Sequence, residues 1–312
     1  MRYNILCATD DKYVPYCGIM LTSLFENNKE CQLFVYLMTE GLSSDSHNIL
    51  KELALRYNQN INIIIVDGKK LAGCPIKQGD HVSLATYYRL LAPILIPKDI
   101  DRILYLDCDM IVNGCIQELY NTDINNTAVA AVLDEDYMTP KRYKRLDYPN
   151  EKKYFNAGML LINLSYWRKN KVMERCFDYI HNNSERIEFH DQDTLNYVLQ
   201  DEKKLISIKN NLQTGFLYIN NKFELNVMGE IINSIGAPVI IHYTGPNKPW
   251  SKGSKHPFAK TFIYYKNISL WKAFPLVKNK TTLYKRLIDF RNELMWLIGI
   301  KKRPKTYITQ AT

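Results

Sequence analysis

Short apolar runs with strand character alternate with helical stretches along most of the chain, and this alternation most constrains the fold. Strand-like runs fall at 3–8, 32–38, 61–66, 102–107, 128–133, 158–164 and 239–242, and helical stretches at 14–27, 43–58 and 83–91. Strands separated by helices are typical of an α/β protein with a mostly parallel sheet covered on both faces. A polar stretch at 134–154 shows no periodicity, so we expect a functional or mobile loop there.

The net charge of +9 is distributed unevenly along the 312 residues. From residue 248 onward, 15 of the 41 Lys and Arg residues stand against two of the 32 Asp and Glu residues, so this part carries +13 and the rest −4. We therefore predict a main domain at 1–251 and a basic, aromatic C-terminal appendage at 252–312. The basic tail indicates an anionic partner, either a membrane surface or nucleic acid, and the alternative is a solvated face.

Apolar residues recur at spacings of three and four between 281 and 300, next to several basic residues. This pattern predicts an amphipathic helix, and a basic helix of this kind can lie on an anionic membrane surface. We therefore predict membrane association through 281–305. A helix packed on its own domain explains the pattern equally well.

The seven cysteines include no C-x-x-C pair, which argues against zinc ribbons and redox motifs. Several lie in apolar runs, where a free thiol acts as a small hydrophobe, so we expect a reducing compartment. Acidic residues follow the N-terminus too closely for a signal-peptide core, and no apolar run approaches the roughly 18 residues that cross a bilayer. We expect a soluble cytoplasmic protein, or one peripheral on the inner face of the plasma membrane.

The run RILYLDCD at 102–109 ends in two carboxylates one residue apart. Alternate side chains on a strand share a face, so Asp107 and Asp109 point the same way at the carboxyl end, where open α/β sheets bind ligands. Two hard oxygen ligands suit Mn²⁺ or Mg²⁺, and His242 at the end of a later strand is a candidate nitrogen ligand. A solvated turn and a structural histidine are the simpler alternatives.

A second acidic group follows the first strand. Asp10 is placed to accept a hydrogen bond from a base or ribose, with Tyr13 stacking on the ring. Capping of the next helix by Asp10 or Asp11 is the simpler interpretation. No G-x-G-x-x-G follows this strand and no P-loop occurs in the chain, so neither of those phosphate-binding motifs is available.

Further polar groups stand at the predicted ends of elements. Gly245 would let the backbone approach a phosphate closely, and Lys248 would neutralise it. The segment HDQDTLN at 190–196 carries more polar groups than one helix cap needs, although at least one acid is expected to act as a cap. FNAG at 155–158 forms a small-residue turn that a ligand can approach.

Six stretches, ATDDKY, HVSLATYYRL, LYLDCDMIV, YFNAGMLLINL, HDQDTLN and HYTGPNKPW, follow one another between residues 8 and 250. In order and spacing they resemble glycosyltransferase family eight, the retaining nucleotide-sugar transferases that include bacterial lipooligosaccharide α-galactosyltransferases and glycogenin. The resemblance covers the catalytic domain and fades in the tail. It implies a GT-A fold, a Rossmann-like, mostly parallel mixed sheet that binds a UDP-sugar and Mn²⁺.

The resemblance also implies roles for single residues. Asp107, Asp109 and His242 match the metal ligands. The positions that match nucleotide and phosphate contacts are Ala8, Asp10, Tyr13, His81, Val82, Gly245 and Lys248. The positions that match donor-sugar contacts are Arg89, Asp134, Asn156, Asp191 and Gln192, of which Asp134, Asp191 and Gln192 are the catalytic candidates. Cys108 and Lys12 depart from the aliphatic residue and the amide usual in the family, but neither departure removes a ligand.

The expected activity is transfer of glucose or galactose from a UDP-sugar to a hydroxyl of a cell-surface glycan or glycolipid, with Mn²⁺ as cofactor and Mg²⁺ as the alternative. Same-face attack is favoured because the neutral amide of Gln192 is a poor nucleophile. A non-catalytic nucleotide-sugar or glycan binder with the same fold is one alternative. A nucleic-acid-binding protein is another, but the candidate site is acid-rich, so we expect no nucleic acid partner.

Overall fold

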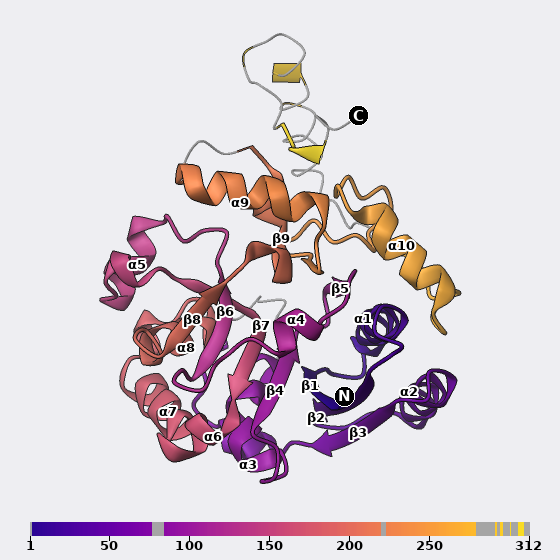
Figure 1. Cartoon of the computed structure of the whole chain (residues 1–312), viewed down its shortest axis with the longest axis horizontal. Helices are drawn as coiled ribbons and strands as arrows, with labels where there is room; N and C mark the ends of the chain where they lie inside the picture. The colour runs from indigo at the N-terminus through magenta and orange to yellow at the C-terminus, as the bar shows by residue number, and fades with distance from the viewer. Residues whose placement is uncertain are drawn as a thin grey trace.

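The computed structural model describes residues 2–76, 84–219, 223–278, 291, 294, 295, 300 and 305–308. A seven-stranded sheet in the order β3-β2-β1-β4-β7-β6-β8 forms its centre (Figure 1). Its strands are β1 (Arg2–Ala8), β2 (Gln32–Thr39), β3 (Asn60–Ile65), β4 (Arg102–Leu106), β6 (Val129–Leu133), β7 (Phe155–Asn163) and β8 (Lys203–Ile206). Neighbours are parallel except at β7, which runs antiparallel to β4 and β6. The predicted α/β fold with a mostly parallel sheet is confirmed.

Helices cover both faces of this sheet, as predicted. The α-helices are α1 (Val14–Glu26), α2 (Ser44–Arg56), α3 (Ala92–Leu95), α4 (Gln117–Tyr120), α5 (Pro140–Leu146), α6 (Leu164–Lys169), α7 (Val172–Asn182), α8 (His190–Val198), α9 (Leu225–Gly236) and α10 (Ala259–Ile268). Short 3₁₀ helices are η1 (Gly68–Leu71), η2 (Leu84–Leu91), η3 (Asn150–Lys152), η4 (Ser184–Arg186), η5 (Ile208–Asn210) and η6 (Thr214–Leu217). Because side chains alternate along a strand, Ile5 of β1 joins the core under α1 and α2, whereas Leu6 joins the core under η2 and α6 to α8.

A second sheet has three strands in the order β5-β10-β9, formed by β5 (Met110–Val112), β9 (Leu212–Gln213) and β10 (Ile240–His242). The strand predicted at 239–242 therefore does not join the main sheet, and the edge strand β8 was not predicted. Three apolar residues show strand character but carry no information about which partner they pair with. In β8 two lysines and partial exposure obscure the apolar pattern.

The stretch at 134–154 is not a loop throughout, contrary to expectation. It contains α5, whose first turn begins with Pro140, and η3. Tyr143, Leu146, Tyr148 and Tyr154 form a small core of their own beneath it. A helix of seven residues is too short to show a helical period in the sequence. The stretch predicted as helical at 83–91 is the 3₁₀ helix η2 over its described residues.

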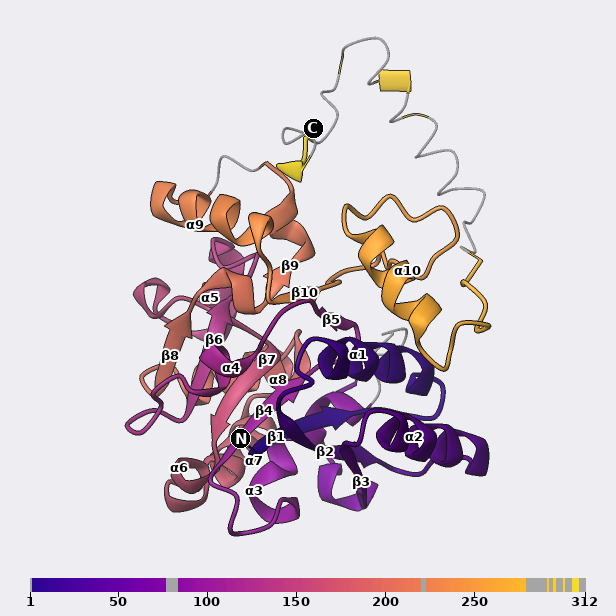
Figure 2. The same cartoon turned by 45° about the vertical axis from the view of Figure 1, so that its right-hand side comes forward.

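Residues after the predicted boundary at 251 contact the first helix. In Figures 1 and 2, α10 lies beside α1. Asn27 Nδ2 donates to the Tyr265 hydroxyl at 2.7 Å, and the Trp271 ring lies where a Cβ on Gly18 would be. The predicted membrane helix at 281–305 lies outside the described residues apart from 291, 294, 295, 300 and 305. No helix among the described residues is both long and apolar enough to span a bilayer.

Candidate metal centre and active site

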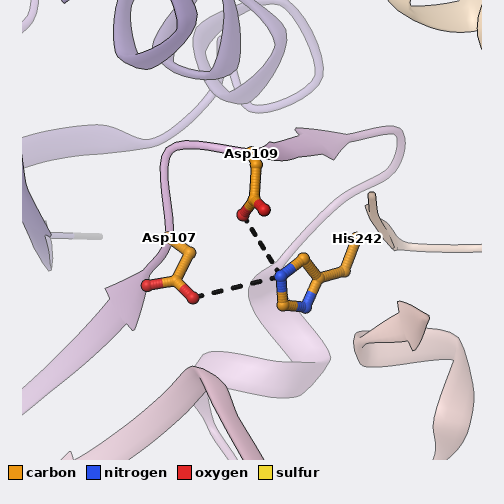
Figure 3. A group of neighbouring side chains, drawn as sticks. All are labelled: Asp107, Asp109 and His242. Atoms are coloured by element: carbon orange, nitrogen blue, oxygen red, sulfur yellow. Dashed lines mark ion pairs between the residues drawn. The ribbon is translucent and has the colours of Figure 1, made fainter. Parts of the chain in front are cut away.

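Three metal-ligating side chains converge beyond the carboxyl end of β4. Asp107 and Asp109 lie on the turn between β4 and β5, and His242 ends β10, which pairs antiparallel with β5. His242 Nε2 lies 3.2 Å from Asp109 Oδ1 and 3.9 Å from Asp107 Oδ2, facing both carboxylates (Figure 3). One ligand atom from each residue lies within 4.8 Å of the other two. The structure thus brings together the three predicted ligands.

The orientation of His242 is set by its other ring nitrogen. Asn211 Nδ2 donates to Asn156 Oδ1 at 2.9 Å, which leaves Asn211 Oδ1 to face His242 Nδ1 at 3.0 Å. This amide orientation is assigned from the hydrogen-bond network, and in it Nδ1 carries the proton. The lone pair of Nε2 then points at the carboxylates, as metal-binding histidines require.

Gly158 provides the space that the cluster needs. A Cβ at this position would lie 2.3 Å from His242 Cε1 and 2.8 Å from Asp107 Oδ2. Gly158 belongs to an irregular part of β7, where its pairing with β6 shifts register. Two carboxylates and one imidazole around this space fit a first-row divalent cation such as Mn²⁺.

Hydrogen-bond donors, two of them cationic, contact both carboxylates. Lys248 Nζ donates to Asp109 Oδ2 at 2.6 Å, while Arg89 Nη2 and the Tyr105 hydroxyl donate to Asp107 Oδ1 at 2.9 and 2.7 Å. Burial alone would raise the pKa of Asp109, but the charge of Lys248 holds that pKa far below its usual range. Asp109 is therefore ionised at neutral pH and can bind a cation.

A second group of predicted residues lies beside the triad. Asp134 Oδ2 accepts from Asn156 Nδ2 at 3.3 Å and from Gln192 Nε2 at 3.2 Å. Gln192 Oε1 accepts from the backbone N–H of Ala157 at 2.9 Å. Because β7 runs antiparallel to its neighbours, its amino end, with Asn156, meets the carboxyl ends of β4 and β6. The three side chains therefore share one edge of the sheet.

Arg89 connects Asp191, another predicted site residue, to the metal centre. Its guanidinium is buried and lies 3.0 Å from Asp191 Oδ2 while also donating to Asp107. Thr86 Oγ1 donates to the other oxygen of Asp191. Burial raises the pKa of Asp191 in spite of Arg89. Asp193, two residues on, is the acid that acts as a helix cap, since its Oδ2 accepts from the backbone N–H groups of Glu188 and Phe189 at 2.8 Å.

Three residues predicted to contact the nucleotide, Ala8, Asp10 and Tyr13, lie between the end of β1 and the start of α1. Ala8 ends β1, and its carbonyl accepts from Cys108 Sγ at 3.2 Å. Asp10 Oδ1 accepts from the backbone N–H of Tyr13 at 2.9 Å, and burial, followed by the charge of Asp109, raises the pKa of Tyr13 to about 12. Asp10 thus stabilises the turn before α1 but does not cap the helix, whose N-cap is Tyr13 and has no side-chain cap.

Of the other residues predicted near the nucleotide or the start of α1, the structure describes Gly245 and Asp11 but not His81 and Val82. Gly245 has a φ of +72°, which favours glycine, so its place in the loop after β10 has a backbone reason. Asp11 Oδ1 accepts from the backbone N–H and hydroxyl of Ser43 at 2.9 and 3.0 Å and so contacts α2 rather than capping α1. His81 and Val82 fall within 77–83, outside the described residues.

Several residues of the site, among them Tyr105, Thr86, Asn211 and Arg142, were not found from the sequence. Asn211 orients His242, and Arg142 Nη1 lies 2.6 Å from Asp134 Oδ1. Arg142 is buried between the rings of Tyr154 and Phe189, at 4.4 and 4.7 Å from their centres. Its only signal was position, inside the polar stretch that follows Asp134. An asparagine and an arginine in such segments look like ordinary surface residues until the fold buries them.

Comparison with known proteins identifies the family. The model of glycosyl transferase family 8 matches residues 4–253. This chain belongs to glycosyl transferase family 8. The chain is 30% identical to general stress protein A of Bacillus subtilis over 86% of this chain and 94% of that protein. It is 29% identical to a lipopolysaccharide 1,2-glucosyltransferase of Escherichia coli, over 88% and 81%, and 28% identical to a lipopolysaccharide 1,3-galactosyltransferase of Salmonella typhimurium, over 90% and 82%.

Solved structures confirm the fold. The galactosyltransferase LgtC, crystallised with donor and acceptor sugar analogues, aligns with a TM-score of 0.77 at 24% identity, covering 86% of this chain and 96% of that one. The family 8 chain therefore has the GT-A fold, as the sequence resemblance implied. The predicted ligand and substrate roles of individual residues stay predictions.

Proposed function

We propose that this family 8 chain is a metal-dependent retaining hexosyltransferase. It would move glucose or galactose from a UDP-sugar to a hydroxyl of a cell-surface glycan or glycolipid. The observation that carries the proposal is an unbroken series of hydrogen bonds from His242 through Asn211 and Asn156 to Asp134. A cation site joined in this way to a second polar group suits a donor whose diphosphate and sugar are bound side by side. Relatives named as glucosyl- and galactosyltransferases support these two sugars.

Groups at and around the triad would stabilise the negative charge that develops on the leaving group. A divalent ion held by Asp107, Asp109 and His242 would supply Lewis-acid stabilisation of the departing diphosphate. Lys248, already directed at Asp109, is placed to donate to a diphosphate oxygen. The positive φ of Gly245 shapes the loop that would lie against the same phosphates.

Same-face attack fits the surroundings of Gln192. Both ends of its amide are occupied, by Ala157 N–H and by Asp134, so the side chain is held as an orienting group and not as a nucleophile. In the proposed reaction the bond from the anomeric carbon to the phosphate oxygen breaks and a bond to the acceptor oxygen forms on the same face. The acceptor proton goes to the departing phosphate oxygen.

A donor screen tests the proposal. UDP-glucose, UDP-galactose and their N-acetyl forms are incubated with the chain and Mn²⁺, and release of UDP is measured. We expect Asp109→Asn to lower release by more than about a hundredfold, because loss of groups that only support a metal ligand already costs about 10- to 100-fold. Asp178→Asn, on the exposed face of α7, is the matched control and should leave release unchanged.

Calorimetric titration of UDP with and without Mn²⁺ separates the alternatives. Metal-dependent UDP binding without release from any donor would favour a non-catalytic nucleotide-sugar binder. Absence of both would refute the transferase. We further propose a cytoplasmic location with attachment to the inner membrane face through 281–305, and no nucleic acid partner, since the candidate site is acidic.

A further inference from the structure

A pocket separate from the metal centre lies beside α5. It has a volume of about 370 Å³ and is bounded by α5, by the turn at 149–153 and by the residue that precedes α9. Small-molecule sites range from about 300 to 1,000 Å³, so the volume suits one small ligand. We call it the α5 pocket. None of its lining residues belongs to the predicted donor or metal site.

The lining of the α5 pocket combines apolar surface with hydrogen-bonding groups. Tyr137 and Met138 contribute apolar surface, and Met138 is 43% exposed. Glu151 and Glu224 contribute carboxylates, and Lys153 donates to Glu224 at 2.9 Å while its Nζ lies 5.8 Å from the centre of the Tyr137 ring. Apolar walls with a few directional polar groups match a sugar, which presents C–H groups on its faces and hydroxyls at its edge.

The charges of the lining favour a neutral occupant over an anionic one. Two carboxylates line the pocket against the single ammonium group of Lys153, and Lys153 is already paired with Glu224. A phosphate or a carboxylate would meet net repulsion here. A neutral hexose, whose hydroxyls donate to carboxylates and accept from lysine, meets none.

Tyr137 lines the pocket, and its hydroxyl is buried. The Tyr137 side chain is 2% exposed, and its hydroxyl makes no hydrogen bond of standard geometry to the described residues, although the backbone of Glu224 lies close enough to lower its pKa. Burial outweighs this and raises the pKa, so the hydroxyl stays protonated.

The pocket lies next to the proposed donor-sugar group. Tyr137 N–H donates to the Asp134 carbonyl at 3.0 Å, which closes a turn that keeps the two Cα atoms within about 7 Å. Arg142 of α5 contacts the Asp134 carboxylate. The same helix, α5, therefore lines the pocket and contacts the Asp134 carboxylate.

We propose that the α5 pocket is an acceptor subsite that binds a neutral hexose ring one or two positions removed from the ring that receives the transferred sugar. The proposal rests on the proposed hexosyltransferase function. It assigns to Met138 and Glu151 a role in selecting acceptor length, distinct from the donor chemistry at the triad.

The test measures binding of sugars of increasing length to the full chain by saturation-transfer NMR and calorimetry. The probes are methyl α-glucoside, maltose and maltotriose, and in parallel methyl β-galactoside and lactose. In at least one series we expect the longest sugar to bind about tenfold or more tightly than the single ring. Met138→Ala combined with Glu151→Ala should reduce this ratio to about two or less.

The matched control combines Leu55→Ala with Glu52→Ala on α2, where Leu55 is 74% exposed, and should keep the full ratio. The proposal is overturned if length has no effect on binding in either series, or if the pocket variant keeps the ratio of the unmodified chain. UDP release from a UDP-sugar is measured on the same proteins without an added acceptor sugar, so that donor turnover is scored separately from acceptor binding. Absence of release in every sample would count against the proposed transferase, while the binding ratio would still decide the pocket.

Discussion

Single residues at the metal centre act by leaving space and by fixing their neighbours. Gly158 leaves the space in which the His242 ring and the Asp107 carboxylate approach each other. Asn211 fixes the proton on His242 Nδ1. Neither residue is a ligand, yet both determine whether the three ligand atoms face one point. Substitution at such a position should affect metal binding more than folding.

Gly158→Ala tests this at one residue. Its Cβ would displace His242 or Asp107, so we expect Mn²⁺ affinity in the presence of UDP to fall by about tenfold or more while the far-UV circular dichroism is unchanged. Gly229→Ala, in α9 with no atom near the added Cβ, is the control and should bind Mn²⁺ normally. Unchanged affinity in Gly158→Ala would show that the ligands tolerate the added methyl group.

At the residue scale, Glu135 also makes the free energy of unfolding depend on pH. Its Oε2 accepts from Thr244 Oγ1 at 3.1 Å and from the backbone N–H of Gly215. Burial, followed by the charge of Asp134, raises its pKa from 4.5 to about 7. Between these values the folded chain binds more protons than the unfolded chain, so the contribution of Glu135 to stability is largest at low pH and is lost as the pH rises toward 7.

Glu135→Gln removes this titration. Relative to the unmodified chain, we expect the variant to gain about 2 to 3 kcal/mol of unfolding free energy between pH 5 and pH 8, measured by urea unfolding. Glu118→Gln, whose side chain is 81% exposed, serves as the control and should show no such gain. An equal difference from the unmodified chain at both pH values in Glu135→Gln would contradict the assignment.

At the scale of elements, a buried ion pair joins α5 to α8. Arg145 Nη1 lies 2.8 Å from Asp193 Oδ2, and the Asp193 side chain is fully buried. The same carboxylate accepts from the Tyr154 hydroxyl at 2.7 Å and caps the start of α8. Through these contacts α5 is held against the helix that carries Asp191 and Gln192.

Asp193→Ala should therefore lower the free energy of unfolding by about 3 to 5 kcal/mol, because it leaves Arg145 without its buried partner. Chemical unfolding followed by tryptophan fluorescence measures the change. Asp201→Ala breaks the ion pair with Lys152, in which the Asp201 side chain is 63% exposed, and should cost less than about 1 kcal/mol. Similar costs for the two variants would mean that the buried pair contributes no more than a surface one.

At the scale of the whole molecule, the segment after residue 251 packs on the part of the chain that contains Asp107, Asp109 and His242. Trp271 is 6% exposed and lies on Gly18 of α1, and Phe262 of α10 is 2% exposed. These contacts join α10 and its following turn to the core that contains α1 and the second sheet. Residues 259–271 therefore contribute to the stability of the core that includes α1.

Trp271→Ala should lower the free energy of unfolding of the whole chain by about 3 to 5 kcal/mol, as expected for a large buried aromatic residue. The unfolding curve should remain a single transition with a lower midpoint. Ile232→Ala, on a side chain that is 55% exposed, is the control and should change the midpoint little. A second transition, with the main midpoint unchanged, would instead indicate that 252–278 unfolds as a separate unit.

The sequence by itself determined the α/β class, the family and the three candidate metal ligands. Repeated strand-like runs indicate a parallel sheet whatever their exact ends, and the apolar run before Asp107 and Asp109 predicts that both carboxylates lie at the carboxyl end of a strand. The two residues lie on the turn after β4, whereas the alternation of side chains had predicted that they share one face of a strand. These features depend on residues close together in the chain. His242 was predicted from its position at the end of an apolar run and from the family resemblance.

Only the tertiary structure decided which distant residues share the site. The antiparallel direction of β7 brings Asn156 to the edge where β4 and β6 end, and the pairing of β5 with β10 in a second sheet brings His242 to the aspartates. Strand direction, strand partners and the burial of Arg142 result from packing across the whole chain. Local sequence patterns carry no signal for such long-range contacts, because the same short run can pair with many partners until the complete core selects one.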